Sequence, residues 1–326
     1  MIGPERDSTG PPPWVVETVA ALIGPIRRLE PVRLRLRPGS GVWRVTGTRG
    51  VVALKVASAG ADGGVLREGD VVAALDAGRL LPRWLLAARG RGNDVAWMAT
   101  WWQAGRHLLG AWRSLAASDN WSPDTTRAVL ADAAACARAL ADLHRAGVRH
   151  GDLRPERLVC GLGGRAAAMI VGWASGAFTR RSASGLVAPA YTGGCPLYAA
   201  PEVGRALVEG RVPERSEAAD VWALAESIRV ALGGRPLRIG SGERPWEVVA
   251  AGHPRPFAAG TARRLPELAA LLARALDPDP RARPSADEIA CLLQDAVSHR
   301  ARAERGEATT RSWHTRVRWA PLRWAV

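Results

Sequence analysis

The chain has 326 residues, of which 47% are hydrophobic, enough for one large domain or two modest ones with a buried core. Its four cysteines form no C-x-x-C pair, which argues against a disulfide framework or a zinc site, and no uncharged apolar run approaches the roughly 18 residues that span a bilayer. The formal charge of +14 would suit acidic partners, but the 45 basic residues are scattered, so we expect an ordinary solvated surface. A globular protein in a reducing, cytoplasmic setting is therefore expected.

The start of the chain is predicted to lead into a set of strands. Residues 1–13 include three consecutive prolines and are expected to form a flexible Pro-rich leader. They lack the basic and apolar regions of a signal peptide, so secretion is not expected. The apolar spacing of Trp14–Ile23 predicts a short amphipathic helix. From Val32 to Val56, short apolar runs separated by glycine-containing turns predict successive antiparallel strands.

One helix and two further strands are predicted next. The helix covers Val65–Leu75, and the strands cover Arg83–Ala88 and Val95–Trp102, joined by a turn at Arg89–Asp94. This region, residues 14–104, is therefore expected to form a small antiparallel sheet with one main helix.

After Gly105 the pattern becomes helical. Alanine and leucine at helical spacing predict helices, the clearest of which cover Thr125–Ala146, Ala218–Leu232 and Leu265–Leu276. Strands followed by helices favour an α+β fold with two lobes, the second of them over residues 105–299. The remaining residues, 300–326, are arginine-rich, contain three tryptophans and are expected to form a tail.

The single lysine of the chain, Lys55, lies in the predicted strand Val52-Ala53-Leu54-Lys55-Val56. With the segments that follow, this strand resembles a protein kinase, particularly the bacterial serine/threonine kinase-like group, over roughly residues 30–296. The resemblance implies a two-lobed protein-kinase-like fold. It also implies that Lys55 reaches the phosphates of ATP and pairs with a helix glutamate, for which Glu68 is the candidate.

The longest match is the segment from His144 to Leu158, H-R-A-G-V-R-H-G-D-L-R-P-E-R-L, which is similar to the catalytic loop of that family. By this resemblance, Asp152 would accept the proton of a substrate hydroxyl. Arg154 stands where serine/threonine kinases carry a lysine that touches phosphate. Structural alternatives remain open, because a loop aspartate is commonly a cap and an arginine commonly a surface charge.

The magnesium ligands of a kinase are missing at the corresponding positions. Arg157 replaces the expected asparagine, and Gly172 replaces the expected aspartate. Magnesium requires oxygen ligands, whereas arginine offers no acceptor and stays positively charged. The resemblance therefore implies ATP as the cofactor and argues against magnesium. One hypothesis is a metal-independent nucleotide pocket in which Arg157 neutralises phosphate charge together with Lys55 and Arg154.

A short glycine motif precedes the lysine strand. Gly39, Ser40 and Gly41 are similar to the end of a glycine-rich phosphate loop, which makes them candidate nucleotide contacts. An ordinary hairpin turn is the alternative, because the full G-x-G-x-x-G spacing is absent.

Later segments resemble structural parts of the same family. Residues 194–202 are similar to the segment that ends in A-P-E, with Cys195 in place of the usual threonine, and residues 281–285 are similar to the closing R-P-S. The resemblance implies that Asp220, in a central helix, stabilises the loop of Asp152, and that Arg283 forms a buried ion pair with Glu202.

Three tryptophans, Trp97, Trp101 and Trp102, cluster where the two lobes and the adenine pocket should meet. Core packing is the expected role, and an aromatic wall for a purine is the alternative.

The favoured function is a regulatory pseudokinase, and the alternative is an active, atypical ATP-dependent serine/threonine protein kinase that uses Lys55, Glu68 and Asp152. His150-Gly151-Asp152 also resembles the H-G-D of small-molecule phosphotransferases, although the A-P-E-like segment argues against that class. A basic adaptor that binds nucleic acid or anionic membrane through residues 300–326 is the remaining alternative. A protein partner or protein substrate is expected, nucleic acid is not, and membrane contact would be peripheral through the tail.

Overall fold

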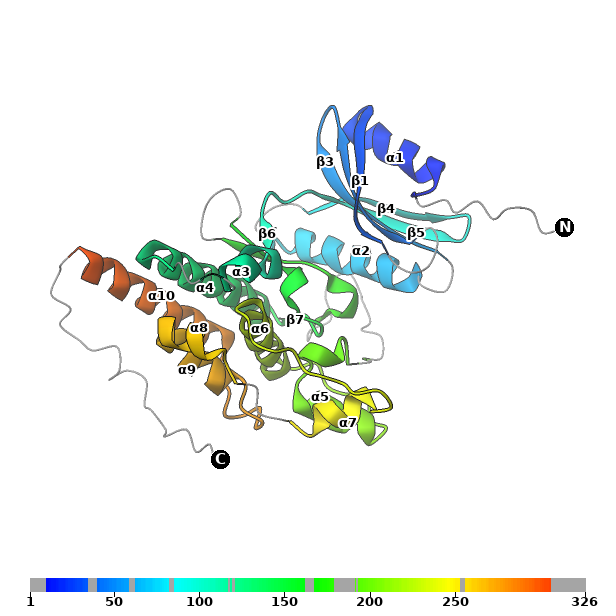
Figure 1. The fold of residues 1–326 in the computed structure, drawn as a ribbon. Coiled ribbons are helices and arrows are strands. Elements are labelled where there is room, and N and C mark those ends of the chain that lie inside the picture. Colours follow the sequence, from blue (N-terminus) through cyan, green and yellow to red (C-terminus); the bar gives the residue numbers. More distant parts are fainter. Residues whose placement is uncertain are drawn as a thin grey trace.

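The computed structural model describes residues 10–34, 40–58, 62–81, 85–116, 118, 121–161, 167–178, 191, 193–252 and 256–305. Gly39 and residues 306–326 of the predicted tail lie outside these ranges. The described residues form an α+β fold in which a five-stranded antiparallel sheet with two helices precedes a larger, mainly helical part (Figure 1). This arrangement is compatible with two lobes. None of the described helices combines the length and the apolar character needed to cross a bilayer.

The first part contains the sheet. Its elements are α1 (Pro13–Ile23), β1 (Ile26–Leu34), β2 (Gly41–Gly47), β3 (Val51–Ser58), α2 (Asp62–Ala77), β4 (Leu86–Gly92) and β5 (Val95–Trp101). The strands lie in the order β1-β2-β3-β5-β4, and every neighbouring pair is antiparallel. The predicted small antiparallel sheet with a main helix is therefore confirmed.

The turn predicted at Arg89–Asp94 is too long. Residues 89–92 belong to β4, where they pair with β5, and only Asn93 and Asp94 form the turn, both with positive φ. The extension is explained by a close tertiary contact, because a Cβ at Gly90 would lie 2.9 Å from Nε1 of Trp97 on β5. Glycine therefore lets β4 continue beside the large indole ring.

The alternation of side chains along β3 decides where Lys55 points. Val52 and Leu54 are fully buried and pack with Val15 and Val19 of α1 on one face of the sheet. Successive strand residues face opposite sides, so Lys55 lies on the other face, together with α2. Figure 1 shows α1 and α2 on opposite sides of the sheet.

Of the three clustered tryptophans, Trp97 is buried, whereas Trp101 and Trp102 are partly buried. Trp97 is 4% exposed and belongs to the cluster under α1, which confirms the expected core role, and Trp101 packs partly against the same cluster. Trp102 is different, because the guanidinium of Arg44 lies 5.1 Å from the centre of its ring.

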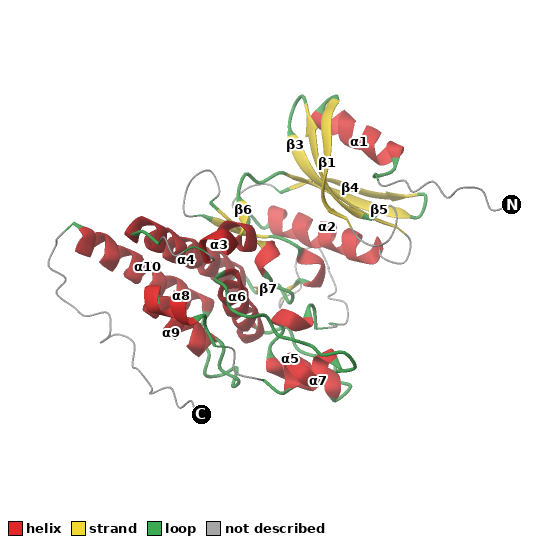
Figure 2. Cartoon of the chain, viewed as in Figure 1, coloured by secondary structure: helices red, strands yellow, loops and turns green. Residues whose placement is uncertain are grey.

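The second part is dominated by helices (Figure 2). Its helices are α3 (Leu108–Ala116), α4 (Pro123–Arg145), α5 (Pro201–Val208), α6 (Glu217–Ala231), α7 (Pro245–Ala250), α8 (Ala259–Arg264), α9 (Pro266–Ala275) and α10 (Ala286–Glu304). Short strands and 3₁₀ turns connect them: β6 (Arg106–His107), β7 (Val148–Arg149), η1 (Pro155–Arg157), β8 (Leu158–Cys160), β9 (Ala168–Ile170), η3 (Trp173–Ser175), β10 (Ala177–Phe178) and η4 (Pro196–Tyr198).

The three helices predicted here are confirmed as α4, α6 and α9. The start of α4 follows from local chemistry, because the Ser122 side chain accepts a hydrogen bond from the Thr125 N–H and Pro123 occupies the first turn. Helix α10 packs along α4 and continues to Glu304, so residues 300–304 of the predicted tail are helical.

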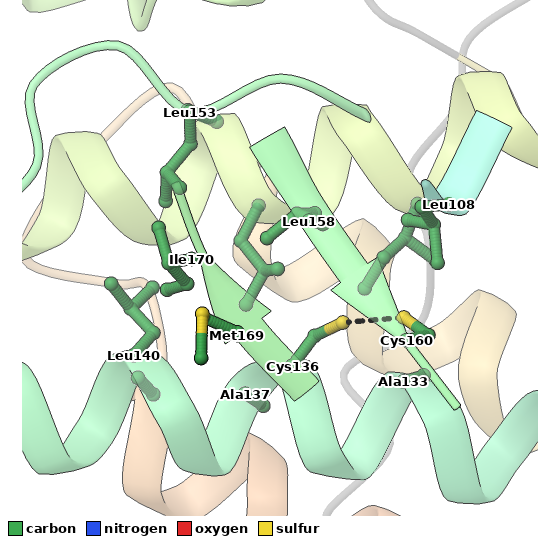
Figure 3. Close-up of a cluster of buried hydrophobic side chains, with 14 of the residues drawn as sticks. Leu108, Ala133, Cys136, Ala137, Leu140, Leu153, Leu158, Cys160, Met169 and Ile170 are labelled. Atoms are coloured by element: carbon green, nitrogen blue, oxygen red, sulfur yellow. Dashed lines mark hydrogen bonds between the residues drawn. The ribbon is translucent and has the colours of Figure 1, made fainter. Parts of the chain in front are cut away.

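The core beneath β8 and β9 supports the segments that carry the candidate site. Figure 3 shows Leu158, Cys160 and Met169 from these strands packed against Cys136 and Leu140 of α4. These side chains are at most 2% exposed, and the Sγ atoms of the two cysteines lie 3.3 Å apart. The rigid packing fixes the two segments that flank β8 and β9, which are residues 150–157 (the Asp152 loop) and residues 171–172 (the Gly172 turn).

Candidate functional site

Lys55 and Glu68 form an ion pair between Nζ and Oε2. The Glu68 side chain is 8% exposed and that of Lys55 is 24% exposed, so the lysine keeps some access to solvent. Helix α2 brings Glu68 to the sheet, and the neighbouring Arg67 joins α2 to the residue after η3 by donating to the Gly176 carbonyl at 2.7 Å. The pairing expected for these two residues is present.

Both carboxylate oxygens of Asp152 are engaged. Oδ1 accepts a hydrogen bond of 2.8 Å from the Cys195 N–H, and Oδ2 lies 2.6 Å from Nη1 of Arg157. The Cys195 segment can approach this closely because Gly194 has no Cβ. A Cβ there would lie only 2.8 Å from Oδ1. Asp152 is only 11% exposed at its side chain, so the candidate base is held by the protein itself.

Arg157 connects the Asp152 loop with the Gly172 turn. Its Nη1 donates to the main-chain oxygens of Asp152 and Gly172, at 2.9 Å each, in addition to the ion pair. Burial lowers the pKa of Arg157, the charge of Asp152 opposes this, and the nearby charge of Arg154 lowers it further. Glu68 also acts on Arg157, so the structure brings the two ion pairs within electrostatic range of one another.

The donor set does not fit a magnesium ion. Gly172 supplies no carboxylate, and the guanidinium of Arg157 occupies the space between the two segments that would carry the ligands. A divalent cation here would face a positive group with no acceptor atom. Across the described ranges, no group of three or more His, Cys, Asp or Glu side chains could hold a metal.

His150 is a member of this site that the sequence did not single out. Burial and then the charge of Arg157 lower its pKa to about 4, so the imidazole is neutral. Its Nδ1 accepts from the Asp152 N–H at 3.2 Å, which leaves the proton on Nε2 to donate to the Val171 carbonyl at 3.1 Å. His150 therefore ties the start of the Asp152 loop to the Gly172 turn.

Asp220 of α6 stabilises the Asp152 loop through hydrogen bonds to its main chain. Its carboxylate accepts hydrogen bonds of 2.8 Å from the N–H groups of His150 and Gly151, and lies 3.1 Å from Nε2 of His144. Burial alone would raise the pKa of Asp220, but the interactions with His144 and then with His150 together outweigh it, and the pKa is lowered. The contact expected of this aspartate is present.

The glycine motif has a structural contact of its own. Ser40 is 3% exposed, and its Oγ lies 3.0 Å from Oγ of Ser58 and accepts from the Ser58 N–H at 3.1 Å. Gly41 begins β2 and pairs with residues of both β1 and β3. The Ser40 hydroxyl therefore joins the start of β2 to the end of β3, and nucleotide contact by these residues stays a prediction.

Arg154 precedes η1 in extended conformation and is half-buried. Its buried Nε has no hydrogen-bond partner among the described residues. Its charge acts on Arg157 and on Tyr198, whose pKa is raised to about 12 chiefly by burial. Arg154 thus lies next to the Asp152 and Arg157 pair, and a role toward phosphate stays a prediction.

Sequence reasoning missed the contact from Cys195 to Asp152 and the central position of His150. The H-G-D triplet was the available signal for His150, whereas nothing in the sequence indicates which main-chain N–H reaches Asp152. No protein-family model matches the chain, and no curated protein matches it either.

Proposed function

We propose that this chain is a regulatory pseudokinase: a protein-kinase-like domain that binds a nucleotide or a protein partner and acts through its conformation. The observation that carries the proposal is the ion pair of Arg157 with Asp152, at 2.6 Å. It places a permanent cation on the candidate base at the position where a kinase would bind metal.

This cation works against phosphoryl transfer for two reasons. A general base must contact the substrate hydroxyl, and both carboxylate oxygens of Asp152 are already engaged by the Cys195 N–H and by Arg157. Phosphoryl transfer also relies on metal to neutralise developing charge. Two unit charges about 4 Å apart interact by roughly 4 kcal/mol at an effective dielectric constant near 20, and a divalent ion beside Arg157 would be repelled more strongly.

The kinase-like part of the proposal draws its support from long-range contacts. The pairs Lys55–Glu68 and Arg283–Glu202, and the hydrogen bonds of Asp220 to the Asp152 loop, are the contacts that the resemblance implies. The contacts of Asp220 and Arg283 span 69 and 81 positions of the chain, so a shared local motif alone does not produce them.

ATP is the proposed ligand, bound without magnesium. Lys55 is the partly exposed cation that would meet its phosphates. Nη1 of Arg157 is committed to protein acceptors, so phosphate would meet Lys55, Arg154 and the remaining edge of the Arg157 guanidinium.

Calorimetry of ATP binding tests this function, with magnesium in one set of titrations and a chelator in the other. The variant is Lys55→Ala, and the charge-matched control is Arg244→Ala, whose side chain is 82% exposed and pairs only with Glu247 among the described residues. Metal-independent binding that is lost in Lys55→Ala and kept in Arg244→Ala supports a nucleotide-sensing pseudokinase.

Other results would change the conclusion. No binding under either condition would remove the nucleotide and leave a scaffold for a protein partner. Binding that requires magnesium and is followed by release of ADP would favour an active, atypical serine/threonine kinase, the alternative that the intact Lys55–Glu68 pair supports.

A further inference from the structure

The side chain of Arg157 fills the space beside the α-carbon of Gly172. A Cβ at Gly172 would lie 2.7 Å from both Cδ and Nε of Arg157, and 3.1 Å from its Cγ. Approaches below 3.0 Å require one of the groups to move. In addition, Gly172 has φ 85° and ψ 50°, a left-handed conformation that strains most other residues. Two separate features therefore favour glycine here.

The Arg157 side chain cannot move away from Gly172 easily, because Arg157 is held by hydrogen bonds on either side of Cδ and Nε. Beyond them, Nη1 bonds to the main-chain oxygens of Asp152 and Gly172 and pairs with the Asp152 carboxylate. Before them, the Arg157 carbonyl accepts a hydrogen bond of 2.9 Å from the Val171 N–H. Moving Cδ and Nε would displace Nη1 and break its contacts with Asp152 and Gly172.

We infer that Arg157 is the internal cation that joins the Asp152 loop to the Gly172 turn, and that it requires glycine at position 172. The two residues form a linked pair that keeps the site assembled and excludes a divalent metal. This inference deepens the proposed function in naming magnesium as the excluded ligand, whereas the linkage itself rests on the contacts of Arg157 alone.

A consequence is that neither single substitution restores a two-ligand metal site. In Gly172→Asp the new side chain would meet Arg157 before its carboxylate reached the position of an ion. In Arg157→Asn the cation is removed, but position 172 still offers no side-chain oxygen. Only the double variant supplies two oxygen ligands in an uncrowded space.

A double-mutant cycle on the full chain tests the linkage, with thermal unfolding as the measurement. Gly172→Ala is made in the natural chain and in Arg157→Ala. Left-handed strain is the same in both backgrounds, whereas the clash exists only with arginine. We expect Gly172→Ala to lower Tm by about 5 °C or more in the natural chain, and by less than half as much in Arg157→Ala.

Gly161→Ala is the matched control, because Gly161 also has positive φ, of 70°, and a Cβ there meets no described atom within 4 Å. Its loss should be equal in both backgrounds. Equal losses for Gly172→Ala would overturn the linkage. If Gly172→Ala fails to fold, recovery of folding in the double variant supports the inference, and failure of the double variant while Arg157→Ala folds overturns it.

Electron paramagnetic resonance measures the binding of Mn²⁺ in the absence of nucleotide. This affinity would not change if the pair of Arg157 and Gly172 only stabilised the fold. We expect Arg157→Asn combined with Gly172→Asp to bind Mn²⁺ at least about tenfold more tightly than the natural chain, and Gly172→Asp alone to show no gain. A gain in the single variant, or none in the double variant, would overturn metal exclusion by this pair. Because no nucleotide is present, the result is separate from the calorimetric test of ATP binding.

Discussion

Glu202 and Arg283 lie 81 positions apart and form a two-bond ion pair, with N–O distances of 2.7 and 2.8 Å. The Arg283 side chain is fully buried, and its guanidinium also donates to the carbonyls of Asp277 and Ala218 and lies over the Trp222 ring. This pair joins α5, α6 and the segment before α10.

Glu202→Ala should therefore lower the free energy of unfolding by about 2–4 kcal/mol, because it leaves a buried guanidinium without a counter-charge. Urea denaturation measures the loss. The control is Glu209→Ala, which removes an exposed pair with Arg211 and should change stability by less than about 1 kcal/mol. Similar losses in both variants would show that the Arg283 charge is not buried in solution.

Contacts of this kind were predictable from the sequence because the motifs fix both partners. Glu68, Asp220, Glu202 and Arg283 each belong to a recognisable segment, and each forms its expected contact. The fold class followed from the same information, since strand and helix periodicities change near residue 105.

The contacts that the sequence did not indicate depend on loop geometry and side-chain volume. The bond of Ser40 to Ser58 and that of Cys195 to Asp152 use residues whose types have no special pattern. The resemblance indicated that Arg157 and Gly172 stand where a kinase carries metal ligands, but the steric contact between the two residues could not be predicted. Such a contact exists only after both segments are packed.

Stability is expected to fall as the pH decreases from about 6.5 to about 4, through the titration of His150. Its pKa is lowered from 6.5 to about 4 by burial and by Arg157, so the unfolded chain binds a proton in this range that the folded chain does not. The contribution of His150 to the free energy of unfolding is therefore complete above pH 6.5, and about 3 kcal/mol of it is lost as the pH falls to about 4. Urea denaturation at several pH values measures this slope.

The variant His150→Gln removes the titrating group and should flatten the same part of the profile. Asp220 acts at lower pH, because its pKa is lowered from 3.8, and so it does not account for a change near pH 5. An unchanged slope in His150→Gln would mean that this imidazole does not titrate as a buried neutral group.

Two helix glycines should respond to the same substitution in opposite directions. A Cβ at Gly204 of α5 would lie 2.6 Å from the Ala250 nitrogen and 2.9 Å from the Trp246 oxygen, both main-chain atoms of α7. Gly204→Ala should cost about 1–3 kcal/mol, because α5 and α7 must separate. At Gly110 of α3 a Cβ meets no described atom within 4 Å, so Gly110→Ala should stabilise by up to about 1 kcal/mol. Thermal unfolding of both variants checks the sign. Unchanged or increased stability in Gly204→Ala would contradict the close packing of α5 on α7, and a loss in Gly110→Ala would contradict the open space beside Gly110.

The four thiols should differ in their reaction with an aromatic disulfide reagent, because they differ in burial. Cys291 is exposed and Cys195 is partly exposed, whereas Cys136 and Cys160 are buried between α4 and β8 (Figure 3). The hydrogen bond with Cys160 and then burial raise the pKa of Cys136 well above its usual range, which suppresses the reactive thiolate.

We expect Cys291 to react first and the buried pair to react only after local or global opening, at a rate that urea increases. Cys291→Ser is the control and should remove the fast phase alone. Reaction of all four thiols at one rate in the native protein would contradict the core that holds β8 and β9, and with it the fixed geometry of the Asp152 loop.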